Sequence, residues 1–125
     1  MIGYVTIGAA DVEAALPFFD AVFGAMGGER KSFEDGWGFY GDKGGGGDVG
    51  ICKPRDGQAA RAGNGIMIAF KAPSQDAVRA THAAALANGG SDEGAPGYRP
   101  QDGNTFYGAY FRDPVGNKFC VFHTP

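Results

Sequence analysis

The first stretch with the spacing of an amphipathic helix runs from about Val12 to Ala25. Its apolar residues recur every three or four positions, which places them on one buried stripe. Asp11 is a suitable N-cap, and Gly27-Gly28 supply a stop. Pro17 lies inside this stretch, so we expect it to bend the helix or to loosen its first turns.

A second helix is predicted over residues 75–88, where Ser74 is the N-cap and Gly89-Gly90 form the stop. Each predicted helix is preceded by one short strand-like stretch and followed by three more. The expected strands are IGYVTIGA, GERKSF, GWGFYG and DVGICK around the first helix, and GIMIAFK, a weak strand near residues 91–94, TFYGAYFR and NKFCVFH around the second. The order is therefore β-α-β-β-β, and it occurs twice.

This internal repeat predicts one domain made of two modules. Module 1 covers about residues 1–53, residues 54–64 form a linker, and module 2 covers about residues 65–125. A repeat of this kind usually means that neither copy can bury its apolar face alone. The predicted fold class is α+β, with two βαβββ modules forming curved mixed sheets around a cup.

Alternation along the strands assigns side chains to the two faces of each predicted sheet. The apolar side chains of Val5, Ile7, Ile68, Phe119 and Val121 suit packing under the helices. Mixed side chains then share the opposite faces, which predicts a concave surface, the usual place for a small ligand. These are Tyr4 and Thr6 in the first module, and Met67, Ala69, Lys118, Cys120 and Phe122 in the second.

Composition narrows the possible partners and the setting. The 125 residues are 43% apolar, carry a net charge of −3 and contain no run of Lys or Arg, which argues against nucleic acid or an anionic membrane surface. No apolar run is long enough to span a membrane, and no signal peptide is visible. Two cysteines do not make a disulfide framework, so we expect a reducing, cytoplasmic setting.

The order of several short motifs resembles the glyoxalase/bleomycin-resistance/extradiol-dioxygenase superfamily, the vicinal oxygen chelate fold. These motifs are Asp11-Val12-Glu13 before a helix that contains Phe18-Phe19, and the turn FRDPVGN at 111–117. The segments GNGIMIAFKAPSQDAV, HAAALANGG and GAPGYRP are similar to the small bacterial glyoxalase-like members. The resemblance covers essentially the whole chain, and it implies a homodimer, with or without exchange of modules.

In metal-using members of this superfamily, the cup holds a divalent ion on His and Glu side chains. Carried over by motif, the three ligand positions are Tyr4, Met67 and Cys120 in this chain. A phenol, a thioether and a thiol replace two imidazoles and a carboxylate. We therefore expect the usual metal site to be lost, and we predict no metal and no cofactor.

Each candidate residue also has a structural interpretation. Cys120 is either a nucleophile or a soft-metal ligand, alone or with Cys52, or a small apolar filler, which we favour. Tyr4 either bonds a ligand or fills the former metal cavity. The candidate pocket comprises an aromatic platform of Trp37, Phe39 and Tyr107, the anion-pairing Arg99 and Lys118, and the wall residues Tyr4, Thr6, Cys52, Met67, Cys120 and Phe122.

Three functional hypotheses remain open at this point. The favoured one is metal-free binding of a small aromatic or amphipathic molecule in the cup. The alternative is a metal-dependent enzyme, either a lyase of the lactoylglutathione lyase type or a dioxygenase, which the ligand positions disfavour. The second alternative is a structural or interaction domain whose cup is filled by its own side chains.

Overall fold

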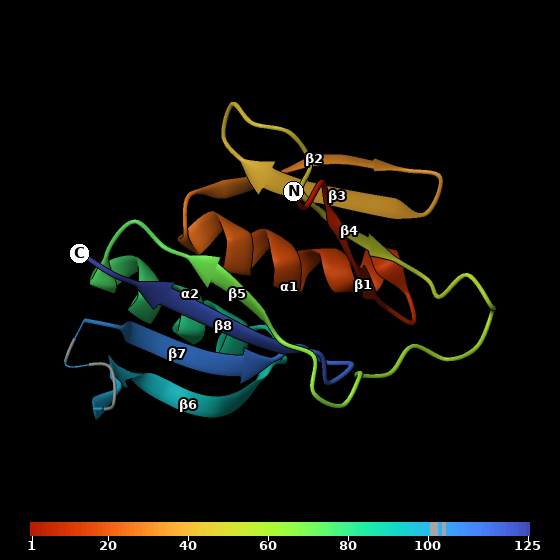
Figure 1. The fold of residues 1–125 in the computed structure, drawn as a ribbon. Helices are drawn as coiled ribbons and strands as arrows, with labels where there is room; N and C mark the ends of the chain where they lie inside the picture. Colours follow the sequence, from red (N-terminus) through yellow and green to blue (C-terminus); the bar gives the residue numbers. More distant parts are fainter. Residues whose placement is uncertain (101–102, 104) are drawn as a thin grey trace.

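The computed structural model describes residues 1–100, 103 and 105–125. The chain folds into two four-stranded mixed sheets and two helices (Figure 1), which confirms the predicted α+β class and the double βαβββ order. The first sheet has the strand order β1-β4-β3-β2, and the second has the order β5-β8-β7-β6. In chain order the elements are β1 (Val5–Gly8), α1 (Val12–Ala25), β2 (Gly28–Glu34), β3 (Trp37–Asp42), β4 (Val49–Cys52), β5 (Ile68–Lys71), α2 (Gln75–Ala87), β6 (Ser91–Tyr98), β7 (Tyr107–Arg112) and β8 (Lys118–His123).

Both helices begin and end where the sequence predicts, within one residue. The Asp11 carboxylate accepts a hydrogen bond from the amide of Ala14 at 3.1 Å, and the Ser74 hydroxyl accepts one from Ala77 at 3.1 Å. Gly27 follows α1 with a φ of 91°, a conformation that favours glycine after a helix. Pro17 lies inside α1, yet the helix continues through it to Ala25.

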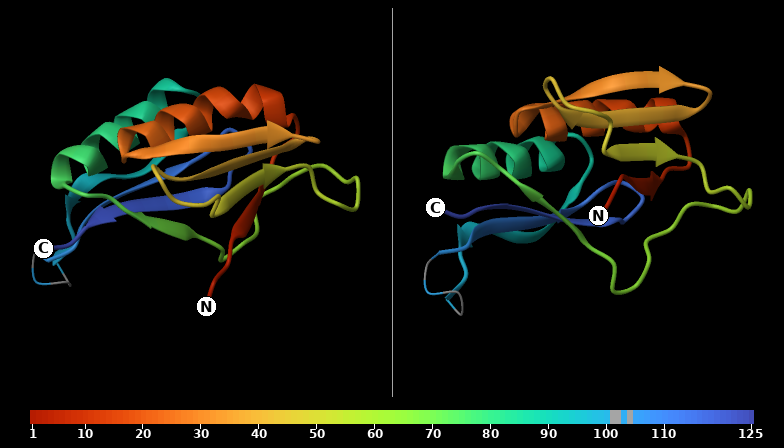
Figure 2. Two further views of the ribbon diagram at one scale, coloured as in Figure 1. Left: turned by 90° about the horizontal axis from the view of Figure 1, so that it is seen from above. Right: turned by 45° about the horizontal axis from the view of Figure 1, so that its top comes forward.

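The helices lie between the two sheets and pack against each other (Figures 1 and 2). Phe19 of α1 shows this arrangement, because its ring contacts Tyr40 of the first sheet and Phe119 of the second. Phe18, also on α1, packs on Phe111 of the second sheet. The helix-facing sides of both sheets therefore share one hydrophobic core.

The other side of each sheet points away from this core, and we call it the open face. Strand alternation places Thr6 and Phe39 on the open face of the first sheet, where they flank Gly50 in the ladder. In the second sheet, Ala69, Cys120 and Tyr110 are ladder partners on the open face. The two open faces lie on the outside of the chain, so they do not enclose a common cup within it (Figures 1 and 2).

The turn between β7 and β8 ties the two modules together. The buried carboxylate of Asp113 accepts hydrogen bonds from the backbone amides of Val115, Gly116 and Asn117 at 2.9–3.1 Å, and another from the Asn117 side chain. The same Asn117 amide nitrogen donates to the carbonyl oxygen of Gly8, at the end of β1, at 3.1 Å. The motif therefore joins module 2 to the first strand of module 1.

We expect Asp113→Ala to lower the free energy of unfolding by about 3 kcal/mol, because it leaves buried donors without an acceptor. Chemical denaturation followed by circular dichroism measures this change. Asp42→Ala, at an exposed strand end, is the control and should stay within about 0.5 kcal/mol of the wild type. Equal effects of the two substitutions would contradict the role of the turn.

Candidate functional site

The open face of the first sheet carries a cluster of aromatic side chains. Trp37 and Phe39 stack with ring centroids 5.5 Å apart and planes 10° apart, and Tyr4 meets Phe39 edge-on at 6.2 Å. The cluster is open to solvent, with exposed fractions of 60% for Tyr4 and 36% for Trp37. We call these three residues the aromatic platform.

Glycine at position 50 makes room for the platform. A β-carbon at Gly50 would lie 3.1 Å from the Phe39 ring and 3.2 Å from the Trp37 ring, closer than such contacts normally come. The two rings therefore lie over the backbone of β4. Thr6 is the neighbour of Gly50 in the ladder and also lies on this open face.

The predicted third member of the aromatic platform lies elsewhere. Tyr107 is buried on the helix-facing side of the second sheet, where its hydroxyl accepts a hydrogen bond from Arg79 of α2 at 2.9 Å. Its ring packs edge-on against Tyr98 at 5.2 Å. Tyr107 therefore supports the contact between sheet and helix, and the Trp37–Phe39 pair is completed by Tyr4 instead.

The open face of the second sheet is built around Cys120 and Tyr110. Tyr110 is the ladder partner of Cys120 in the antiparallel β7–β8 pair. The Arg99 guanidinium carbon lies 4.9 Å from the centroid of the Tyr110 ring, and the Lys118 ammonium lies 5.9 Å from it. Cation–π attraction favours both placements.

Other predicted residues border this arrangement. Phe122 stacks on Phe106 with ring centroids 4.9 Å apart. Met67 is 43% exposed just before β5, and it lines a surface hollow of about 470 Å³ together with Arg112, Lys118 and residues 62–66. Arg99, Met67, Lys118, Cys120 and Phe122 therefore belong to one face, whereas Tyr4, Thr6, Trp37 and Phe39 belong to the other.

Both cysteines are free, and their surroundings make them poor nucleophiles. Burial raises the pKa of the Cys120 thiol, although Tyr110, Arg99 and Lys118 act in the opposite direction. Burial also raises the pKa of Cys52, which lies in the first sheet beside Trp37 in a shallow hollow. A raised pKa keeps both cysteines as neutral thiols. Because the thiolate is the reactive and metal-binding form, these side chains are better suited to packing.

The residues at the superfamily's metal positions do not fit the ion that the superfamily uses. Tyr4 offers a phenol, Met67 a thioether and Cys120 a thiol whose pKa is raised by burial, in place of the imidazoles and the carboxylate that this ion takes. The histidines are engaged elsewhere, since His82 pairs with Asp92 at 3.0 Å and His123 with the Ala72 carbonyl at 3.1 Å. Within the described part of the chain, no three His, Cys, Asp or Glu side chains gather where they could hold a metal ion.

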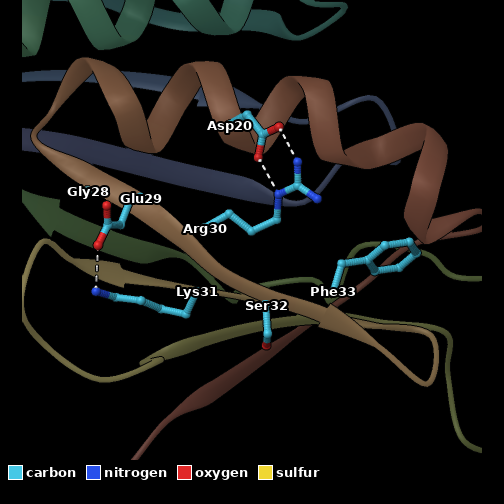
Figure 3. A pocket seen from close by; sticks show the side chains of 7 residues that line it. All are labelled: Asp20, Gly28, Glu29, Arg30, Lys31, Ser32 and Phe33. Carbon is cyan, nitrogen blue, oxygen red and sulfur yellow. Dashed lines mark hydrogen bonds and ion pairs between the residues drawn. The ribbon is translucent and has the colours of Figure 1, made fainter.

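A second, polar groove runs along the outer edge of the first sheet, between α1 and β2 (Figure 3). Arg30 holds Asp20 with two hydrogen bonds of 3.1 Å, and Lys31 pairs with Glu29 at 2.9 Å. The buried Tyr40 hydroxyl donates to Asp20 at 2.7 Å, and burial followed by this contact raises the pKa of Tyr40 well above its ordinary value. These polar groups therefore form hydrogen bonds and ion pairs with one another. None of the residues of the predicted site lies in this groove.

Sequence reasoning missed Tyr110, the residue at the centre of the second open face. Strand alternation predicts this placement, because Tyr110 lies on the same face of β7 as Arg112. The predicted turn also brings Tyr110 opposite Cys120. The aromatic residue chosen instead, Tyr107, is three positions away and therefore lies on the opposite face. Phe106, which packs on Phe122, was also missed.

A family model and a solved structure that is 39% identical both indicate one superfamily. The model of the Glyoxalase/Bleomycin resistance protein/Dioxygenase superfamily matches residues 1–121. A crystal structure of a glyoxalase/bleomycin resistance protein from Albidiferax ferrireducens T118 is 39% identical, with 96% of each chain covered and a TM-score of 0.87. A glyoxalase-related enzyme from Fulvimarina pelagi is 20% identical over 100% of this chain and 88% of that one, with a TM-score of 0.77, and shows the fold alone.

No curated protein matches the chain significantly. No helix in the described residues is long and apolar enough to cross a membrane. The family match spans both modules, and the 39% identical structure covers nearly the entire chain. The chain therefore belongs to the Glyoxalase/Bleomycin resistance protein/Dioxygenase superfamily.

Proposed function

We propose that this protein binds a small aromatic or amphipathic molecule on its open sheet faces without using a metal ion. The observation that carries the proposal is the aromatic platform. Trp37 is 36% exposed although stacking on Phe39 already covers one side of its ring. Aromatic rings presented to solvent on a sheet offer a flat ligand an apolar contact and favourable stacking.

The chemistry at the three metal positions supports binding without a metal. Divalent ions of the kind this superfamily uses take imidazole nitrogen and carboxylate oxygen. Tyr4, Met67 and Cys120 offer a phenol, a thioether and a thiol whose pKa is raised by burial. A function that needs only contact and complementary charge suits these residues better than one that polarises a substrate on a metal.

We further propose that the binding cup forms between two copies of the chain, which lie in the cytoplasm. Strands β1 and β5 are at free edges of their sheets, and large apolar side chains beside them are exposed, with exposed fractions of 60% for Tyr4 and 66% for Ile66. A two-fold axis would place the first sheet of one copy beside the second sheet of the other. Each of the resulting cups would combine one aromatic platform with one face that holds Cys120.

The dimer predicts a mass in solution of twice 12.9 kDa, which light scattering after size exclusion measures. Ile66→Glu should shift the protein toward the monomer, because it puts a charge into the proposed contact. Leu86→Glu is the matched control, since Leu86 is an exposed apolar residue on α2 and away from the open faces. A monomeric wild type, or a dimer that neither substitution disturbs, would contradict this arrangement.

Trp37→Ala should weaken binding of an uncharged aromatic probe, N-phenyl-1-naphthylamine, about tenfold, because it removes the larger ring of the platform. Probe fluorescence during titration gives the dissociation constant. Leu86→Ala removes an exposed apolar side chain elsewhere and should leave the constant within about twofold. Similar constants for both variants would remove Trp37 from the site, and no binding by the wild type would refute the proposed function.

A further inference from the structure

Two basic side chains lie over one aromatic ring on the open face of the second sheet. Arg99 and Lys118 both approach Tyr110, at 4.9 Å and 5.9 Å from the ring centroid. Among the described residues, neither cation has a carboxylate within ion-pair distance. The Glu93 carboxylate pairs with Arg112, the ladder partner of Lys118, and its pKa is lowered by Arg112 and, to a smaller extent, by the nearby charge of Lys118.

The backbone fixes the position of the Arg99 guanidinium. Its Nη2 atom donates to the carbonyl oxygen of Gly108 at 2.9 Å and to that of Ala95 at 3.2 Å. These bonds hold the group against β6 and β7, so its charge does not have to be ordered when a ligand arrives. Preorganised charge of this kind strengthens binding, because less conformational entropy is lost.

Lys118 connects this cluster to the hollow beside it. The hollow, of about 470 Å³, is lined by Lys118, Arg112 and Met67 together with residues 62–66. Lys118 is half-buried, so its charge is less screened by water than that of a fully exposed lysine. The hollow therefore places the apolar side chains of Ile66 and Met67 near a partly shielded positive charge.

We infer that this cluster of Arg99, Tyr110 and Lys118 binds an anionic oxygen group, a carboxylate or a phosphate, on the ligand. The inference rests on the proposed function and narrows it to aromatic or amphipathic anions. Lys118 and Arg99 neutralise the charge, and the apolar part of the ligand lies along Met67 or reaches the aromatic platform of the second copy. The Cys120 thiol takes no covalent part.

Three probes with the same ring system test this assignment: naphthalene-2-carboxylate, 2-naphthyl phosphate and 2-naphthalenemethanol. Titrations followed by backbone amide signals in nuclear magnetic resonance give both affinity and location. We expect the anions to bind about tenfold more tightly than the alcohol, and to shift the amide signals of Tyr110, Lys118 and Cys120. The order of carboxylate and phosphate identifies which anion the site prefers.

Substitutions at Lys118 separate charge from shape. Lys118→Met keeps a long side chain and should weaken binding of the preferred anion about five- to tenfold, while the alcohol stays within about twofold. Lys118→Arg should retain anion binding. Lys71→Met, on the same open face but exposed on β5, is the matched control and should change little.

The outcomes distinguish this inference from the proposed function. If the alcohol binds as tightly as the anions, or if Lys118→Met and Lys71→Met act alike on all three probes, the anion site is refuted and aromatic binding stands. If the anions bind but shift only amides of the first sheet, the assignment to Tyr110 is also refuted. If none of the probes binds, the proposed function fails and the anion site fails with it.

Discussion

The packing of α1 between the two sheets determines the rest of this structure. Its phenylalanines contact core-facing rings of both sheets, Tyr40 on one side and Phe111 and Phe119 on the other. Neither module could bury this face alone, because each supplies only half of the surroundings. Because α1 packs against the helix-facing sides of both sheets, both open faces point outward. The candidate site lies on these outward faces.

The two open faces differ in chemistry in a way that fits one ligand. The first offers stacked rings over a glycine backbone, and the second offers Arg99 and Lys118 on Tyr110. Neither face needs a metal ion for the binding that we propose. If two copies of the chain bring an aromatic face and a cationic face together, their common ligand would have a flat apolar part and an anionic end.

Much of the fold could be predicted from the sequence, because helix caps, strand alternation and the Asp113 turn are local signals. Alternation also assigned Cys120 to the correct face, and it would have assigned Tyr110 if applied to β7. It could not show that Cys120 is only 1% exposed despite lying on an open face, because neighbouring side chains cover it. Nor could it show that both helix faces meet in one core, since periodicity identifies a face but not the partner that covers it.

The central claim is that binding does not depend on a metal, and one paired measurement tests it directly. The purified, untagged protein is exposed to Ni, Zn, Mn and Fe(II), desalted and analysed by elemental mass spectrometry, and N-phenyl-1-naphthylamine is then titrated with and without a chelator. We predict less than about a tenth of an ion per chain and the same affinity in both titrations. A near-stoichiometric metal whose removal abolishes binding would contradict the account and favour a metal-dependent enzyme.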